Sequence, residues 1–86
     1  MLLKFHIDPG HGWLEADVSL LREFNVENVT PYSYIDPAKG IVYLEEDLDA
    51  GRLIDALEDA EVEYDVTYID HRDLCFIREL PPVCWS

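Results

Sequence analysis

The chain has 86 residues, of which 49% are hydrophobic and 12% aromatic, and its formal net charge is -13. A chain of this length forms one domain, and its hydrophobic fraction excludes an intrinsically disordered acidic tail. The charge exceeds the roughly 2–8 charges that keep a small domain in solution, and it disfavours binding to nucleic acid or to anionic membranes. We therefore expect one small acidic domain over residues 1–86 that attracts basic proteins.

The first third of the chain predicts a hairpin and a short helix. Alternating apolar and polar residues predict a strand over 3–7, and residues 13–16 form the returning strand. The sequence DPG at 8–10 is typical of a type II turn, with proline and glycine at its central positions. Ser19 is expected to cap a helix over residues 20–25.

A second hairpin follows, and then a longer helix. Residues 30–36 and 41–45 are rich in β-branched and aromatic side chains, and a turn at 37–40 separates them. Asp47 or Asp49 is expected to cap the helix, which continues to residue 60. Its apolar face has the spacing of an amphipathic helix and consists of Ala50, Leu53, Ile54, Leu57 and Ala60.

The last part of the chain predicts two more strands, over residues 64–69 and 74–80, and the prolines at 81 and 82 end the second one. The order of elements is ββα-ββα-ββ with short links, and short links favour antiparallel pairing. We therefore expect an α+β fold, with an antiparallel sheet of about five to six strands and two helices on one face.

Acidic residues are concentrated between residues 45 and 65, EEDLDAGRLIDALEDAEVEYD, where ten acids accompany one basic residue, Arg52. The helical spacing directs Asp55, Glu58 and Asp59 away from the apolar face, with roughly 5–6 Å between neighbouring side chains. Such carboxylates resemble the phosphates of a nucleic acid, although an ordinary solvated surface is the alternative. The candidate partner-binding acids are Glu45, Glu46, Asp47, Asp49, Asp55, Glu58, Asp59 and Glu61.

Tyrosines form a second candidate surface. Alternation places Tyr32 and Tyr34 on one face of their strand, and Tyr64 and Tyr68 share a face of another. A tyrosine has a rigid apolar ring with a polar tip, which suits protein interfaces, although core packing is the alternative. We include Tyr32 and Tyr34 among the partner-binding residues, and an adaptor that binds through this face is one alternative function.

A metal site is another alternative. His6 and Asp8 lie on the same side of the first strand, and the turn could return His11 toward them. The alternative is that His6 occupies the polar face of the strand while Asp8 and His11 stabilise the turn. A similar loose group is expected to form a solvated turn: Asp70, His71 and Asp73.

The residue pattern does not favour catalysis. Cys75 and Cys84 lack the neighbours that activate a thiol, and we expect Cys75 to be partly buried. The sequence has neither a nucleophile elbow nor a glycine-rich phosphate loop. We expect no enzyme and no cofactor. With neither a signal peptide nor a membrane-spanning run in the pattern, we expect a cytoplasmic protein.

Three segments carry a resemblance: KFHIDPGHGWL at 4–14, YSY at 32–34 and YLEED at 43–47. They resemble small acidic open reading frames of bacteriophages and other mobile elements. The resemblance implies a protein made inside a bacterial host and assigns no site residues. Together with the charge it leads us to expect a non-enzymatic inhibitor of a basic nucleic-acid-binding host protein. Such a protein is similar in character to anti-CRISPR and anti-restriction proteins.

Overall fold

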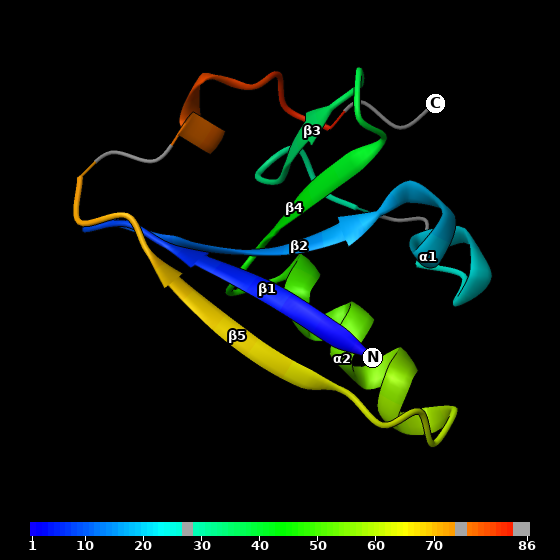
Figure 1. Cartoon of the computed structure of the whole chain (residues 1–86). Coiled ribbons are helices and arrows are strands. Elements are labelled where there is room, and N and C mark those ends of the chain that lie inside the picture. The colour runs from blue at the N-terminus through cyan, green and yellow to red at the C-terminus, as the bar shows by residue number, and fades with distance from the viewer. Residues whose placement is uncertain (27–28, 74–75, 84–86) are drawn as a thin grey trace.

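Five strands and three helical segments make up the part of the chain that the computed structural model describes, residues 1–26, 29–73 and 76–83. The chain is therefore an α+β domain, as expected. In chain order the elements are β1 (Leu2–Ile7), β2 (Gly12–Asp17), α1 (Val18–Glu23), β3 (Tyr34–Asp36), β4 (Ile41–Glu45), α2 (Asp49–Asp59), β5 (Asp65–Asp70) and the 3-10 helix η1 (Phe76–Glu79) (Figure 1).

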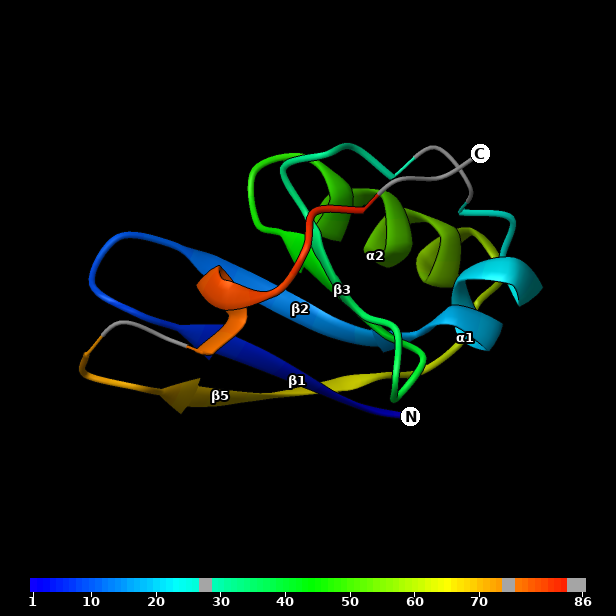
Figure 2. The same ribbon diagram turned by 90° about the horizontal axis from the view of Figure 1, so that it is seen from above.

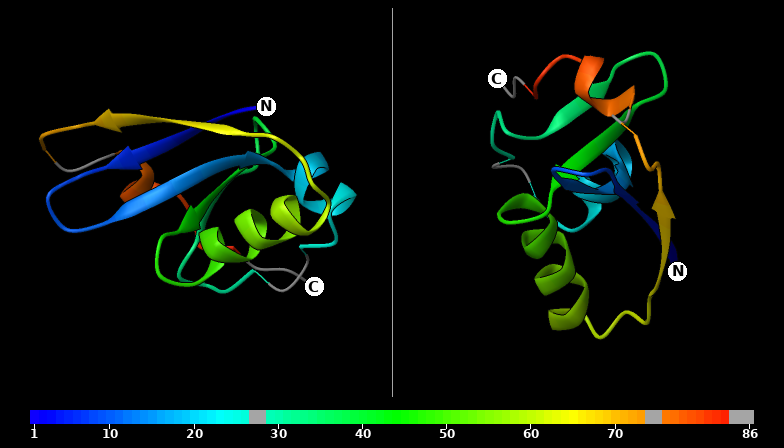
Figure 3. Two further views of the ribbon diagram at one scale, coloured as in Figure 1. Left: turned by 90° about the horizontal axis from the view of Figure 1, so that it is seen from below. Right: turned by 90° about the vertical axis from the view of Figure 1, so that its left-hand side faces the viewer.

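The strands form one mixed sheet in the order β3-β4-β2-β1-β5. Three pairs are antiparallel, but β5 lies parallel to β1, with Leu2 opposite Asp65 and Ile7 opposite Asp70. The expectation of a purely antiparallel sheet is therefore wrong at this edge. The physical reason is that α2 is a crossover connection, which returns the chain to the end of the sheet where β4 began (Figure 3).

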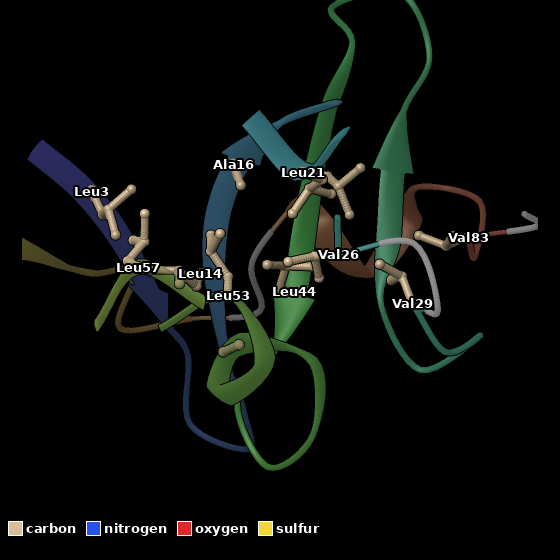
Figure 4. Close-up of a cluster of buried hydrophobic side chains, with 12 residues drawn as sticks. Leu3, Leu14, Ala16, Leu21, Val26, Val29, Leu44, Leu53, Leu57 and Val83 are labelled. Atoms are coloured by element: carbon tan, nitrogen blue, oxygen red, sulfur yellow. The ribbon is translucent and has the colours of Figure 1, made fainter. Parts of the chain in front are cut away.

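The main core lies between α2 and one face of the sheet. Leu53 and Leu57 of α2 are fully buried, and α1 contributes Leu21 from beyond the end of β2 (Figures 2 and 4). The expected arrangement of two helices on one face is not confirmed, because α2 alone covers the sheet and α1 lies at its end. The strand residues of this cluster are Leu3, Leu14, Ala16, Val42 and Leu44.

The opposite face of the sheet carries a smaller cluster made by Trp13, Tyr43 and Ile77, all buried. Ile77 belongs to η1, so the strand expected over 74–80 is wrong in its described part, and residues 74 and 75 lie outside the described residues. A short apolar run does not distinguish a strand from a helical turn. Here the turn conformation places Ile77 against the two aromatic rings of the sheet.

The segment after η1 extends the sheet beyond β3. The Ile35 N–H donates to the Pro81 carbonyl at 3.0 Å, and the Val83 N–H donates to the Ser33 carbonyl at 2.9 Å. Proline is tolerated there because an edge position requires no N–H donor from it. Residues far apart in the chain therefore meet at this edge. The prolines were expected to end a strand, but Pro82 instead bridges to Tyr34.

Several predicted element ends shift. Ser19 lies inside α1, which begins at Val18, so its predicted capping role is wrong. α2 begins at Asp49 with Leu48 in the cap position and no side-chain cap, so neither Asp47 nor Asp49 is a cap. Residues 30–33 are not in β3, which begins at Tyr34; the side chains of Thr30 and Ser33 donate to Asp49 at the start of α2.

The two predicted turns differ in outcome. Gly40 has φ +65°, and its N–H donates to the Asp36 carbonyl at 3.0 Å, which confirms the turn at 37–40. Gly10 is not in the left-handed conformation that a type II turn requires, so that turn type is wrong. Glycine serves a different need there, because a Cβ at residue 10 would lie 2.7 Å from Nη2 of Arg78.

Candidate functional site: an acidic face beside an aromatic groove

Six of the eight candidate acids are exposed, and we call them the acidic face. The buried side of α2 carries Ala50, Leu53 and Leu57, Ile54 and Ala56 pack half-buried beside them, and Asp55, Glu58 and Asp59 face solvent. This agrees with the predicted apolar face except at Ala60, which is exposed and follows the end of the helix. The acidic face lies on α2, the loop before it and the turn after it, and consists of Glu46, Asp47, Asp55, Glu58, Asp59 and Glu61.

Asp49 is not part of the acidic face, because its side chain is completely buried. Its carboxylate accepts hydrogen bonds from the Thr30 N–H at 3.0 Å, from the Thr30 hydroxyl at 2.7 Å and from the Ser33 hydroxyl at 2.5 Å. The Ser33 hydroxyl oxygen in turn accepts the Glu45 N–H at 2.9 Å. Asp49 therefore fastens the 30–33 loop to the start of α2, and its predicted role in partner binding is wrong.

Glu45 is also largely buried, with 9% of its surface exposed. Its Oε2 accepts the N–H groups of Asp47 and Leu48, both at 3.0 Å, and these bonds shape the entry into α2. Within the described structure Oε1 has no hydrogen-bond partner. Since no buried side-chain oxygen among the described residues lacks a partner, Oε1 is accessible to solvent. One oxygen of Glu45 is thus structural and the other is available.

The acidic face affects a neighbouring tyrosine. The Tyr64 hydroxyl donates to Oε1 of Glu58 at 2.9 Å. This hydrogen bond, followed by desolvation and by the charges of Glu58 and Asp55, raises the pKa of Tyr64 above its ordinary value. A negative charge is therefore harder to add at this end of α2, which is the electrostatic behaviour expected beside several carboxylates.

An open groove lies beside the first residues of the acidic face. Its volume is about 520 Å³, and Tyr32 and Tyr34 line it together with Glu45 and Asp47. Tyr32 is 69% exposed, and the ring of Tyr34 lies edge-on to Trp13 at 6.1 Å. The groove brings the two candidate tyrosines next to two candidate acids. The other lining residues are His11, Pro31, Leu48 and Arg78.

Arg78 closes one side of the groove. Its guanidinium carbon lies 5.5 Å from the centre of the Trp13 ring, and its Nη2 donates to Oδ1 of Asp8 at 2.9 Å. Its Nε donates to the other oxygen of Asp8, so the pair is bidentate. Sequence reasoning missed both Trp13 and Arg78 as site residues. The only available signal was their aromatic and basic character, because their meeting depends on the position of η1.

The candidate metal residues are not brought together. His6 is buried, and its two ring nitrogens lie 2.9 Å from His71 Nε2 and 2.9 Å from Glu15 Oε1. Asp8 accepts the N–H groups of Gly10 and His11 as well as Arg78, and His11 is exposed. In the described ranges, no group of three His, Cys, Asp or Glu side chains has a geometry suited to a metal ion.

The group at residues 70–73 is only partly the solvated turn that was expected. Asp70 accepts the Arg72 N–H at 2.9 Å, as in a simple polar turn, but His71 is half-buried against His6. This contact arises from the parallel register of β5 on β1, which places residue 71 beside the end of β1. Cys75, Cys84 and the expected burial of Cys75 lie outside the described residues.

Within the described residues, the structure has no helix of the length and apolar character needed to cross a membrane. Comparisons with protein-family models, with curated proteins and with solved structures find no match for this chain.

Proposed function

We propose that this protein is a non-enzymatic inhibitor that binds a basic, nucleic-acid-binding host protein through its acidic face. The supporting observation is that α2 and its flanking turns expose six carboxylates on a chain of net charge -13. A helix holds such groups at fixed positions, so a basic groove can meet them without first ordering a flexible tail. The targets we favour are bacterial defence complexes of the CRISPR or restriction type.

Several of these acids repel one another within the helix that bears them. Asp55 is one helical turn before Glu58 and Asp59, and like charges at that spacing destabilise a helix by roughly 0.2–0.5 kcal/mol per pair. The buried acids differ, because Asp8 and Asp49 have clear structural roles. Apart from the bond between Glu58 and Tyr64, no hydrogen bond or ion pair among the described residues uses the side chains of the acidic face on α2, and a binding partner of opposite charge would offset their repulsion.

The bacterial setting comes from the resemblance to phage-borne reading frames, and the mechanism comes from the charge. The partner is expected to associate rapidly and to be released by salt, because exposed charges are screened over about 8 Å at physiological ionic strength. Duplex DNA should compete for the same basic surface. The protein itself is expected to bind neither nucleic acid nor membrane.

The test compares two triple variants with the same charge. Asp55→Asn/Glu58→Gln/Asp59→Asn removes three charges from the acidic face, and Asp17→Asn/Glu23→Gln/Asp65→Asn removes three exposed charges elsewhere, so both change the net charge from -13 to -10. Each variant is used to capture proteins from lysates of bacteria with active CRISPR and restriction systems, with and without duplex DNA.

The proposal expects a basic nucleic-acid-binding protein that is captured by the wild type and the control, displaced by DNA and lost with the first variant. Equal capture by both variants would contradict the acidic face as the binding surface. A partner that survives high salt and ignores DNA would instead favour an adaptor that binds through its tyrosines, because apolar burial is not screened by salt.

A further inference from the structure

The aromatic groove is the strongest feature of the molecule that the acidic face does not already explain. Its wall includes Pro31, Tyr32 and Leu48, all exposed, and Leu48 is 47% exposed and Tyr32 69% exposed. Large apolar side chains gathered around one hollow are unusual in a small acidic domain, where exposed apolar residues are normally scattered. The groove is therefore a candidate binding site, and its polar groups indicate which kind of group it binds.

The polar groups of the groove indicate the charge of that occupant. The carboxylate of Asp47 is exposed and has no hydrogen bond or ion pair among the described residues. Oε1 of Glu45 is also available, since only Oε2 is used by the backbone. Arg78, the one Lys or Arg among the described residues that line the groove, is neutralised by Asp8 in a bidentate pair. The groove thus presents negative charge next to aromatic rings.

The molecule already contains an example of the complementary contact. The guanidinium of Arg78 lies over the Trp13 ring while a carboxylate holds it from the side. A guanidinium is planar and weakly hydrated, so it stacks on an aromatic face and bonds a carboxylate at the same time. Tyr32, Tyr34 and Asp47 offer the same combination on the open side of the groove.

We propose that this groove takes an arginine side chain from a basic segment of the partner protein. The guanidinium would stack on Tyr32 or Tyr34 and donate to Asp47 and to Oε1 of Glu45. The inference deepens the proposed function and rests on it, because it names the residue type by which a basic partner is anchored beside the acidic face. Long-range attraction then comes from α2, and the short-range selection of arginine comes from the groove.

The experiment uses the whole chain labelled with ¹⁵N and a capped peptide of alternating arginine and glycine, with the matching lysine peptide as a comparison. Binding is followed by chemical-shift changes. We expect the arginine peptide to shift the signals of residues 31–34 and 45–48, and to bind more tightly than the lysine peptide. Tyr32→Ala and Asp47→Asn should each weaken binding by roughly two- to fivefold.

Asp59→Asn is the matched control, because it removes the same charge from an exposed position on α2 outside the groove. It should weaken binding less than Asp47→Asn does. Equal weakening by the two variants, with shifts confined to α2, would overturn the groove as the arginine site and leave the acidic face intact. Equal affinity of the two peptides would overturn the selection of arginine.

The two proposals fail separately. If the arginine peptide occupies the groove but neutralising Asp55, Glu58 and Asp59 leaves host-protein capture unchanged, the groove inference stands and the acidic-face mechanism fails. Tyr32 and Asp47 are both exposed, so their variants are expected to fold, and circular dichroism and thermal unfolding verify this.

Discussion

His6 and His71 are hydrogen-bonded to each other, with Nδ1 of the first 2.9 Å from Nε2 of the second, although 65 residues separate them. The other nitrogen of His6 lies 2.9 Å from Glu15 Oε1, so three side chains from β1, β2 and the end of β5 form a chain. The imidazole rings are also stacked, with centres 5.1 Å apart. This chain joins the parallel edge strand to the middle of the sheet.

Replacing His71 with alanine should destabilise the protein. The change leaves Nδ1 of the buried His6 without its partner, which costs about 1–2 kcal/mol. Chemical unfolding measures the free energy of unfolding. His11→Ala is the control, because the His11 side chain is exposed and contacts the Trp13 ring without bonding His6. Equal stability of the two variants would show that the imidazole pair contributes nothing.

The pair of Asp8 and Arg78 should fasten the β1–β2 hairpin to η1. The Asp8 side chain is fully buried and Arg78 is 31% exposed, so Arg78→Ala removes the charged partner of a buried carboxylate that also accepts the Gly10 and His11 N–H groups. We expect a loss of about 1–3 kcal/mol, at the lower end because water reaches the guanidinium.

Gly10→Ala tests the same contact from the other side. The added Cβ would lie 2.7 Å from Arg78 Nη2, so the end of the Arg78 side chain must shift and its pair with Asp8 is expected to weaken. The substitution should lower the free energy of unfolding in the wild type and have little effect in Arg78→Ala. Additive effects in this double-mutant cycle would mean that Gly10 is required for another reason.

Two aspartates of α2 should respond in opposite ways to the same change. Asp49→Ala removes the acceptor of Thr30 and Ser33 and should cost about 2–4 kcal/mol, since these donors are left unpaired inside the protein. Asp59→Ala should change stability by less than about 0.5 kcal/mol, with a tendency to stabilise, because it relieves repulsion on an exposed face. Thermal unfolding of the two variants side by side decides this, and a large loss for Asp59→Ala would contradict it.

Glu58→Gln should lower the pKa of Tyr64 toward its ordinary value, because the hydrogen bond to the Glu58 carboxylate is the largest cause of the upward shift. The ultraviolet absorbance of tyrosinate is followed as a function of pH. Replacing the other tyrosines one at a time identifies which titration belongs to Tyr64. A pKa raised in the folded state favours the protonated folded protein. Its contribution to stability is therefore present below the unfolded pKa of about 10 and is lost as pH rises through the folded value. An unchanged Tyr64 pKa in Glu58→Gln would contradict the assignment.

Local patterns predicted the parts of the fold that depend on neighbouring residues. The apolar spacing of Leu53 and Leu57 located α2, and the β-branched and aromatic residues at 41–45 located β4. The turn at Gly40 followed from backbone chemistry, because glycine occupies the left-handed conformation without strain. Each of these features is determined by residues that are close together in the sequence.

Features that depend on pairing across the molecule were not predictable. Asp49 has the same sequence surroundings as the exposed acids near it, and only the position of Thr30 and Ser33 makes it a buried acceptor. The contact of His6 with His71 requires the parallel register of β5, which no hydrophobic pattern encodes. The groove likewise depends on η1, whose sequence pattern fits a strand equally well.

The place of β1 between β2 and β5 has a consequence for synthesis of the chain. Leu2 pairs with Asp65, so β1, which is made before the other strands of this sheet, receives its second neighbour only after α2 has been made. Until then β1 has an unpaired backbone edge, which is a template for association with other chains. Closing this pair also requires a large loop, which slows folding relative to a protein with local contacts. The nascent chain is therefore most exposed to aggregation just before β5 emerges.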